Sequence, residues 1–125
     1  MSKTAIVIYS DPKSGTDEAL GRLFNGMFVA YELLEKKQEV ALLFQGAGVR
    51  WASELVQTEH PAHALYTAVK DSVVGVCGGC ADVFGATQDA TAAGATLIHE
   101  KAIPGTSGII DLSKYLDAGY RVLTF

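Results

Sequence analysis

The chain has 125 residues, 49% of them hydrophobic and 19% charged, which suffices for one substantial core but not for two. Its 10 basic and 14 acidic residues give a net charge of −4 without any basic cluster, which argues against nucleic acid and anionic membranes as partners. No apolar stretch approaches the ~20 residues of a membrane span and the first residues lack a signal-peptide pattern, so we expect one cytoplasmic domain over residues 1–125.

Apolar runs alternate with helical patterns along the chain. The first run, residues 5–9, is continuous, as in a strand buried on both faces, and a loop of turn-forming residues separates it from a long helix capped by Thr16 or Asp17. A further helix follows the cysteine pair of the third strand. In chain order we predict strands over residues 5–9, 40–44, 72–76, 95–98 and 120–125, and helices over residues 17–37, 49–56, 62–70, 87–93 and from 109 until Gly119 ends the last.

This alternation predicts parallel βαβ units with right-handed crossovers. The expected fold is a Rossmann-like α/β fold, a three-layer α/β/α sandwich whose mainly parallel sheet has about five strands. Functional groups in such sheets collect beyond the carboxyl ends of the strands. We therefore expect four segments to meet at that edge: residues 10–16, 45–50, 77–80 and 99–108.

Both cysteines of the chain lie in one motif, Cys77-Gly78-Gly79-Cys80, directly after the third predicted strand. On a first helical turn the two side chains share a face, so their sulfurs could bridge. A helix N-terminus favours the thiolate, which is the reactive form of cysteine, and the two glycines place no Cβ over the sulfur. Sulfur transfer or thiol exchange is the chemistry that suits this arrangement, with Cys77 and Cys80 as candidate catalytic residues.

Three other interpretations of the pair are open. The cysteines could be small buried hydrophobic residues, and the carboxylate of Asp82 would oppose a thiolate. A zinc site would add His60 and His63, but these precede the cysteines across a βα connection, unlike the ligands of common zinc modules, so we expect no metal. A thioredoxin-like oxidoreductase also carries CxxC after a strand, although here the motif follows the third strand and lacks aromatic and proline neighbours.

Other residues at the predicted edge are candidates for ligand contact. Arg50 could bind an anion, or be a solvated residue at a helix start. Gly46 and Gly48 could expose backbone N–H groups or form a tight turn, and because their loop lacks G-x-G-x-x-G we expect no cofactor. Asp11 could line the mouth or form a turn, and His99 could be a base near the cysteine or a surface residue. The candidate ligand-binding residues are Asp11, Gly46, Gly48, Arg50, Gly78, Gly79 and His99.

Four stretches, taken in their order and spacing, resemble the DsrE/DsrF-like sulfur-relay family, which has a YchN-like fold. They are residues 6–11 before a long helix, residues 42–49, Val76-Cys77 with Ala81 and Gly85 behind it, and residues 112–125. The resemblance covers nearly the whole chain. It implies a Rossmann-like fold and assembly into homo-oligomers, either trimers or hexamers.

In the sulfur-relay members of that family, a cysteine after the third strand carries a persulfide between donor and acceptor proteins. Cys77 matches this position, which makes a persulfide carrier or thiol-exchange protein the leading hypothesis. Cys80 has no equivalent in the relay subunits, although some members carry paired cysteines, so it could resolve a persulfide, form a disulfide or be inert. The alternative is a non-enzymatic module on the same fold that binds a small ligand or a partner, since no clear general base accompanies the cysteines.

Overall fold

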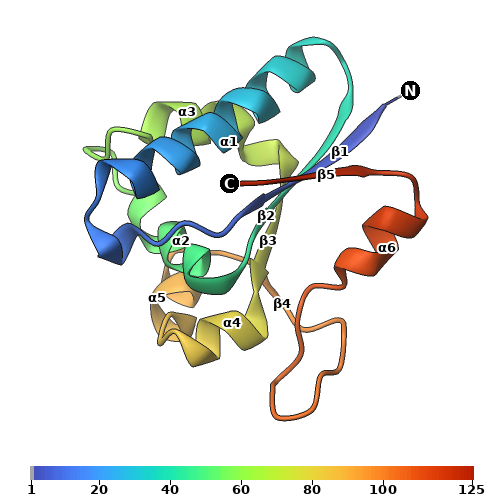
Figure 1. Cartoon of the computed structure of the whole chain (residues 1–125). Helices are drawn as coiled ribbons and strands as arrows, with labels where there is room; N and C mark the ends of the chain where they lie inside the picture. The colour runs from blue at the N-terminus through green and yellow to red at the C-terminus, as the bar shows by residue number, and fades with distance from the viewer. Residues whose placement is uncertain (1) are drawn as a thin grey trace.

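The computed structural model describes residues 2–125 of the chain. One five-stranded sheet lies at its centre, and all of its paired strands are parallel, in the order β4-β3-β2-β1-β5 (Figure 1). The predicted α/β fold with a mainly parallel sheet is therefore confirmed. The strands are β1 (Lys3–Ile8), β2 (Glu39–Phe44), β3 (Val73–Cys77), β4 (Leu97–Ile98) and β5 (Arg121–Thr124).

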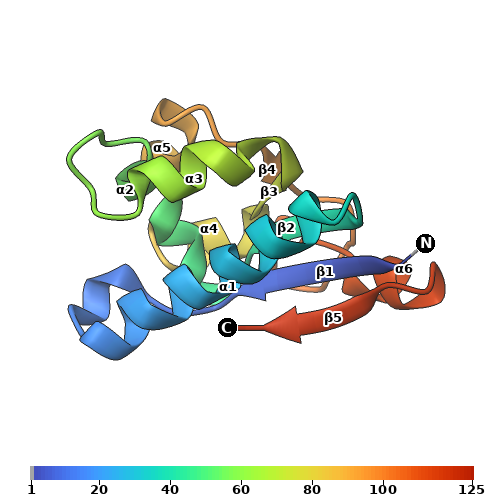
Figure 2. The ribbon, with the colours of Figure 1, turned by 90° about the horizontal axis from the view of Figure 1, so that it is seen from above.

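Helices connect the strands and cover both faces of the sheet (Figures 1 and 2). The successive steps from β1 to β4 run in one direction across the sheet, so right-handed crossovers place their helices on one face. The chain then returns from β4 to β5 across the other face, through residues 99–111 and α6. The helices are η1 (Pro12–Ser14), α1 (Asp17–Glu35), η2 (Gly46–Arg50), α2 (Trp51–Leu55), α3 (His63–Val69), η3 (Lys70–Ser72), α4 (Gly78–Val83), α5 (Thr87–Ala92) and α6 (Leu112–Asp117).

Two predicted helices differ from the observed ones. The helix expected over residues 49–56 is divided into η2 and α2, because the chain enters a tighter 3-10 turn already at Gly46. The last helix begins at Leu112 and not at Ile109, since Ile109 is held in an extended bridge to Lys101 and the Asp111 carboxylate caps α6 by accepting from the Ser113 N–H. Thr16, one of two predicted caps, does cap α1 by accepting from the Ala19 N–H at 3.1 Å.

The core sits between the central strands and α1, and it fixes where β1 and β2 end. The side chains of β1 from Ala5 to Ile8 are all fully buried, as the continuous apolar run predicted. At the end of β1, Gly48 of η2 packs directly against the Ile8 backbone, where a Cβ would overlap the Ile8 carbonyl oxygen. The indole N–H of Trp51 then donates to the Ser10 carbonyl oxygen at 2.7 Å. These contacts join the first two loops at the carboxyl edge of the sheet.

Candidate functional site

The structure brings the four predicted segments together beyond the carboxyl ends of the strands. Arg50 of η2 contacts Asp11 in the loop after β1, and α4, which begins directly after Cys77 and carries Cys80, lies beside η2. The loop after β4, residues 99–108, packs onto the start of α4, where the Gly79 N–H donates to the Gly108 carbonyl oxygen at 2.8 Å. This edge holds two distinct clusters, one around the cysteines and one around Arg50.

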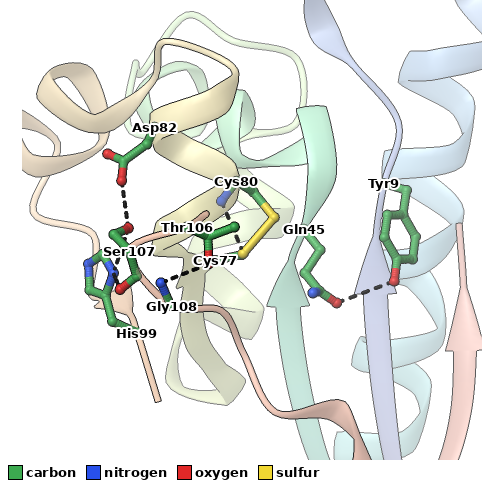
Figure 3. Close-up of a disulfide and its surroundings, with 9 residues drawn as sticks. All are labelled: Tyr9, Gln45, Cys77, Cys80, Asp82, His99, Thr106, Ser107 and Gly108. Atoms are coloured by element: carbon green, nitrogen blue, oxygen red, sulfur yellow. Dashed lines mark hydrogen bonds between the residues drawn. A yellow bond between two sulfur atoms is a disulfide. The ribbon is translucent and has the colours of Figure 1, made fainter. Parts of the chain in front are cut away.

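Cys77 and Cys80 are joined by a disulfide where β3 passes into α4 (Figure 3). Cys77 is the last residue of β3 and the N-cap of α4, and its Sγ accepts from the Cys80 backbone N–H at 3.2 Å. The two Cα atoms lie 5.2 Å apart, within the range that a disulfide requires. The sequence left open whether Cys80 resolves a persulfide, forms a disulfide or is inert, and in the structure it forms a disulfide with Cys77.

The two cysteines differ in burial. Cys77 is 0% exposed among core side chains, whereas Cys80 is partly exposed and packs against the core from outside. The expectation that Gly78 and Gly79 leave the Cys77 sulfur accessible is therefore wrong. Both glycines are buried, and they allow other groups to approach: a Cβ on Gly78 would overlap the His99 imidazole, and one on Gly79 would lie 3.0 Å from the Gly108 carbonyl oxygen.

A chain of polar side chains fastens the loop after β4 to α4 (Figure 3). The Ser107 hydroxyl donates to the Asp82 carboxylate at 2.5 Å, and the Thr87 hydroxyl donates to its other oxygen at 2.6 Å. The His99 Nδ1 lies 3.0 Å from the Ser107 carbonyl oxygen and 3.2 Å from its hydroxyl. The hydrogen bond from Ser107, followed by that from Thr87 and by the charge interaction with His99, lowers the pKa of Asp82 below its ordinary value. Asp82 therefore anchors the loop in its ionised form.

His99 lies at the predicted edge, against the backbone of Gly78, and its ring nitrogen is directed to Ser107. The sequence placed His99 correctly in the loop but did not indicate its partner Ser107, or the hydrogen bonds of Ser107 and Thr87 to Asp82. The Ser107–Asp82 contact spans 25 residues, so no local pattern announces it. A weak signal was available, because Ser107 lies in one segment expected at this edge and Asp82 follows another, residues 77–80, by two positions.

Arg50 makes the second cluster, and its guanidinium is engaged by protein groups. One nitrogen donates to the Asp11 carboxylate at 2.8 Å, and Nε and the other nitrogen donate to the Phe84 carbonyl oxygen at 3.2 and 3.0 Å. The other Asp11 oxygen accepts from the Lys13 N–H at 2.9 Å. Arg50 thus ties together the loop after β1, the start of α2 and the end of α4.

The glycines of this second cluster shape the turn. Gly46 has φ +56°, a left-handed conformation that side chains rarely adopt, which explains glycine at this position. The Gly48 N–H donates to the Gln45 carbonyl oxygen at 3.0 Å, so this N–H is already used within the turn. Both glycines therefore act in the geometry of the βα connection.

Two residues beside the disulfide were not singled out from the sequence. Tyr9 follows β1 and Gln45 follows β2, and the Tyr9 hydroxyl donates to the Gln45 side-chain oxygen at 3.3 Å (Figure 3). Burial raises the pKa of Tyr9, which keeps the phenol protonated as the donor. Their position immediately after neighbouring strands is the signal that could have identified them, because such residues share one edge of a parallel sheet.

The two histidines considered as zinc ligands serve the turn between α2 and α3. The His60 Nδ1 accepts from the Ala62 N–H at 3.1 Å, and the His63 Nδ1 lies 2.7 Å from the Leu55 carbonyl oxygen. Across residues 2–125 the structure groups no three or more His, Cys, Asp or Glu side chains in a way that could hold a metal ion. None of the helices in this part of the chain combines the length and apolar character needed to cross a membrane.

The fold and the edge together define an α/β protein with a closed cysteine pair at the carboxyl end of its third strand. The model of the DsrE/DsrF-like family matches residues 2–125, and the chain belongs to this family. It is similar to the uncharacterised protein MJ0733 of Methanocaldococcus jannaschii, with 33% identity over 101 residues, covering 81% of this chain and 78% of the relative. A solved structure, the conserved protein of unknown function BT1422 from Bacteroides thetaiotaomicron, has the same fold, with a TM-score of 0.62, 20% identity and coverage of 99% and 95%.

Proposed function

We propose that this protein carries sulfur as a cysteine persulfide, or exchanges thiols, through the Cys77–Cys80 pair. The observation that supports this most is the pair itself: both thiols of the chain meet in one disulfide at the edge where α/β sheets collect their functional groups. Membership of the DsrE/DsrF-like family supports the same class of function. We assign the activity to the two cysteines as a unit.

The reduced pair has the chemistry that sulfur transfer needs. A cysteine thiolate attacks the terminal sulfur of a persulfide donor RS–SH; the new S–S bond forms on the cysteine, the donor S–S bond breaks, and RS⁻ leaves with the electron pair. An acceptor thiolate takes the sulfur by the same attack on the cysteine persulfide. Alternatively the second cysteine attacks the inner sulfur, releases hydrosulfide and closes the Cys77–Cys80 disulfide. The closed pair is then the discharged state.

Association with other protein chains belongs to this proposal. Phe28 and Tyr31 of α1 are 45% and 41% exposed and lie three residues apart, which places them on one face of the helix. Exposed aromatic side chains of this kind are enriched at protein interfaces. We propose a homo-oligomer, a trimer or a hexamer, that meets sulfur-donor and sulfur-acceptor proteins, and light scattering that reports a monomer at micromolar concentration would contradict the assembly.

Mass spectrometry of the reduced protein tests the proposed chemistry. We expect wild-type protein treated with inorganic polysulfide to gain the mass of one sulfur atom and to lose it again when glutathione is added as acceptor. The Cys77→Ser/Cys80→Ser double variant should gain none, because the chain has no other cysteine. Reduced wild-type protein that neither gains sulfur nor closes its disulfide, or a double variant that is modified equally, would refute the proposal.

A binding module remains the second candidate, and one observation favours it. A cavity of about 180 Å³ lies over β3, with Tyr66 and Lys70 of the α3–η3 segment in its lining and neither cysteine among its lining residues. Apolar cavities with a few polar groups are the usual form of small-ligand sites. The binding module would replace the carrier if cells that express the Cys77→Ser/Cys80→Ser variant keep the full function of the wild type.

A further inference from the structure

The two sulfurs of the disulfide are not equivalent toward an incoming thiol. Thiol–disulfide exchange requires the attacking thiolate to reach one sulfur along the S–S axis, while the other sulfur leaves. Cys77 is 0% exposed and ends a strand that lies between β2 and β4, whereas Cys80 sits on the first turn of α4 and is partly exposed. Access from solvent therefore favours Cys80 as the sulfur under attack.

Cys77 lies among closely packed elements, and its side chain is buried. Cys77 pairs with Ile98 of β4 on one side of its strand. On the other side of the strand, the preceding residue Val76 pairs with Phe44 of β2. On the third side the loop of residues 99–108 packs against Gly78 and Gly79, held by the hydrogen bond between Gly79 and Gly108. Because the Cys77 side chain is 0% exposed, an external thiolate has no open approach to its sulfur, whereas Cys80 is partly exposed.

The same geometry prepares Cys77 to leave. When the S–S bond breaks, the electron pair and the negative charge pass to the departing sulfur. The Cys80 backbone N–H already donates to the Cys77 Sγ at 3.2 Å, and a hydrogen bond to a sulfur strengthens when that sulfur becomes charged. No reorganisation of the backbone is needed for this stabilisation. The hydrogen bond favours breaking the bond in one direction, with Cys77 as the leaving thiolate.

We propose that Cys80 is the catalytic residue at which external thiols open the disulfide, and that Cys77 is the buried leaving group. This inference rests on the proposed function and adds the order in which the two sulfurs act. A thiolate RS⁻ attacks the Cys80 Sγ, an RS–S bond forms there, and Cys77 departs as the thiolate. A second RS⁻ attacks the RS sulfur of the mixed disulfide, RSSR forms and the Cys80 thiolate leaves, so the cysteine pair gains two electrons in total.

The order differs from what the family resemblance implies, because that resemblance points to Cys77 as the working sulfur. Both statements hold if Cys80 opens the pair and the freed Cys77 thiolate then takes part in sulfur transfer. Cys80, which the relay subunits lack, would then be the sulfur through which the disulfide is reduced. A small thiol can reach Cys80 because this cysteine, on the first turn of α4, is partly exposed.

Trapping the mixed disulfide tests the order directly. Oxidised wild-type protein is mixed with reduced glutathione and quenched early with iodoacetamide, and peptide fragmentation between Gly78 and Gly79 locates each modification. We expect glutathione on Cys80 and the alkyl group on Cys77. Glutathione found on Cys77 as often as on Cys80, or more often, would overturn the proposal.

Single-cysteine variants give a second measurement that does not depend on trapping. Cys80 in Cys77→Ser should react with iodoacetamide at least about ten-fold faster than Cys77 in Cys80→Ser, because thiol reactivity follows access. In urea the two rates should converge, which shows that the fold causes the difference. Equal rates in the native protein, or a faster Cys77, would contradict the proposal.

The failure of this inference and that of the proposed function have different signatures. If polysulfide fails to modify the reduced wild type while glutathione still enters at Cys80, the sulfur-carrier function falls and the order stands. If polysulfide modifies the pair while glutathione enters at Cys77, the function stands and the order falls. The two experiments therefore judge the two statements separately.

Discussion

The carboxyl edge of the sheet has two clusters that are built in different ways. Around Arg50, a guanidinium joins Asp11 and the Phe84 carbonyl oxygen, and glycine backbones lie directly on the end of β1. Around Cys77, a reversible covalent bond closes the pair, and the loop of residues 99–108 packs on the neighbouring Gly78 and Gly79, held by exposed polar side chains. The Arg50 cluster holds the loops in place. In the cysteine cluster, the disulfide can be reduced and the exposed hydrogen bonds of the loop can exchange with water.

The two clusters differ in the kind of role that they suggest for residues predicted at the same edge of the sheet, a structural role for one and a reactive role for the other. Arg50 and Asp11 are the stronger functional candidates by charge, yet each satisfies the other. The cysteines are less polar, yet their bond is the one in this edge that forms and breaks under mild conditions.

The largest expected effect tests the rigidity of the Arg50 cluster. Gly48→Ala should cost about 3 kcal/mol or prevent folding, because its Cβ would overlap the backbone of Ile8, which cannot move without disturbing β1. Gly78→Ala should cost only about 1 kcal/mol, since the obstacle there is the exposed His99 side chain. Urea denaturation compares the two variants. Gly21→Ala is the control, because nothing lies within 4 Å of its added methyl group, and a larger loss for Gly78→Ala than for Gly48→Ala would reverse the contrast.

A smaller effect tests whether Arg50 is structural. Arg50→Met should lower the free energy of unfolding by about 1–2 kcal/mol, because it removes a partly exposed ion pair and the hydrogen bonds to Phe84. Arg22→Met, which removes an exposed ion pair with Glu18, should cost less than about 0.5 kcal/mol. The rates of cysteine alkylation should stay at the wild-type value in both variants. A changed rate in Arg50→Met alone would show that Arg50 acts on the cysteine pair.

The smallest effect concerns the pH dependence of the loop over the cysteines. The pKa of Asp82 is lowered in the folded protein, so its hydrogen bonds stabilise the loop above the pKa of the unfolded chain, and this contribution is lost as the pH falls through the lowered value. Ser107→Ala should raise the pKa of Asp82 toward its ordinary value, as measured by NMR titration of the carboxyl carbons. Ser113→Ala is the matched control, because Ser113 bonds to Asp111 and lowers the pKa of that residue instead. If the pKa of Asp82 is the same in Ser107→Ala as in the wild type, Ser107 does not hold the loop.

Much of the fold could be predicted from the sequence because its signals are local. The continuous apolar runs gave strands whose ends differ from the observed β1, β2 and β3 by no more than two residues. The cysteine motif was placed correctly at the end of β3 because strand and helix patterns meet there. The 3-10 turn of η2 was missed because glycines in such a turn carry no hydrophobic period.

The site was harder to predict because its decisive contacts join distant segments. Next to the buried Cys77, the loop of residues 99–108 packs on Gly78 and Gly79 through a tertiary contact that has no local pattern. The same glycines that suggested open space in the sequence allow that close approach. Arg50 was recognised as important, but its partners, Asp11 and the Phe84 carbonyl, lie 39 and 34 residues away in the chain.

One measurement compares both clusters by the same quantity, the number of sulfur atoms that the protein gains. Reduced wild-type protein, Arg50→Met and Cys77→Ser/Cys80→Ser are treated side by side with inorganic polysulfide, and the intact masses are recorded. We predict that the wild type and Arg50→Met gain one sulfur atom to the same extent and that the double cysteine variant gains none. Sulfur on the double variant, or its loss in Arg50→Met while that variant stays folded, would contradict the assignment of the chemistry to the cysteine pair.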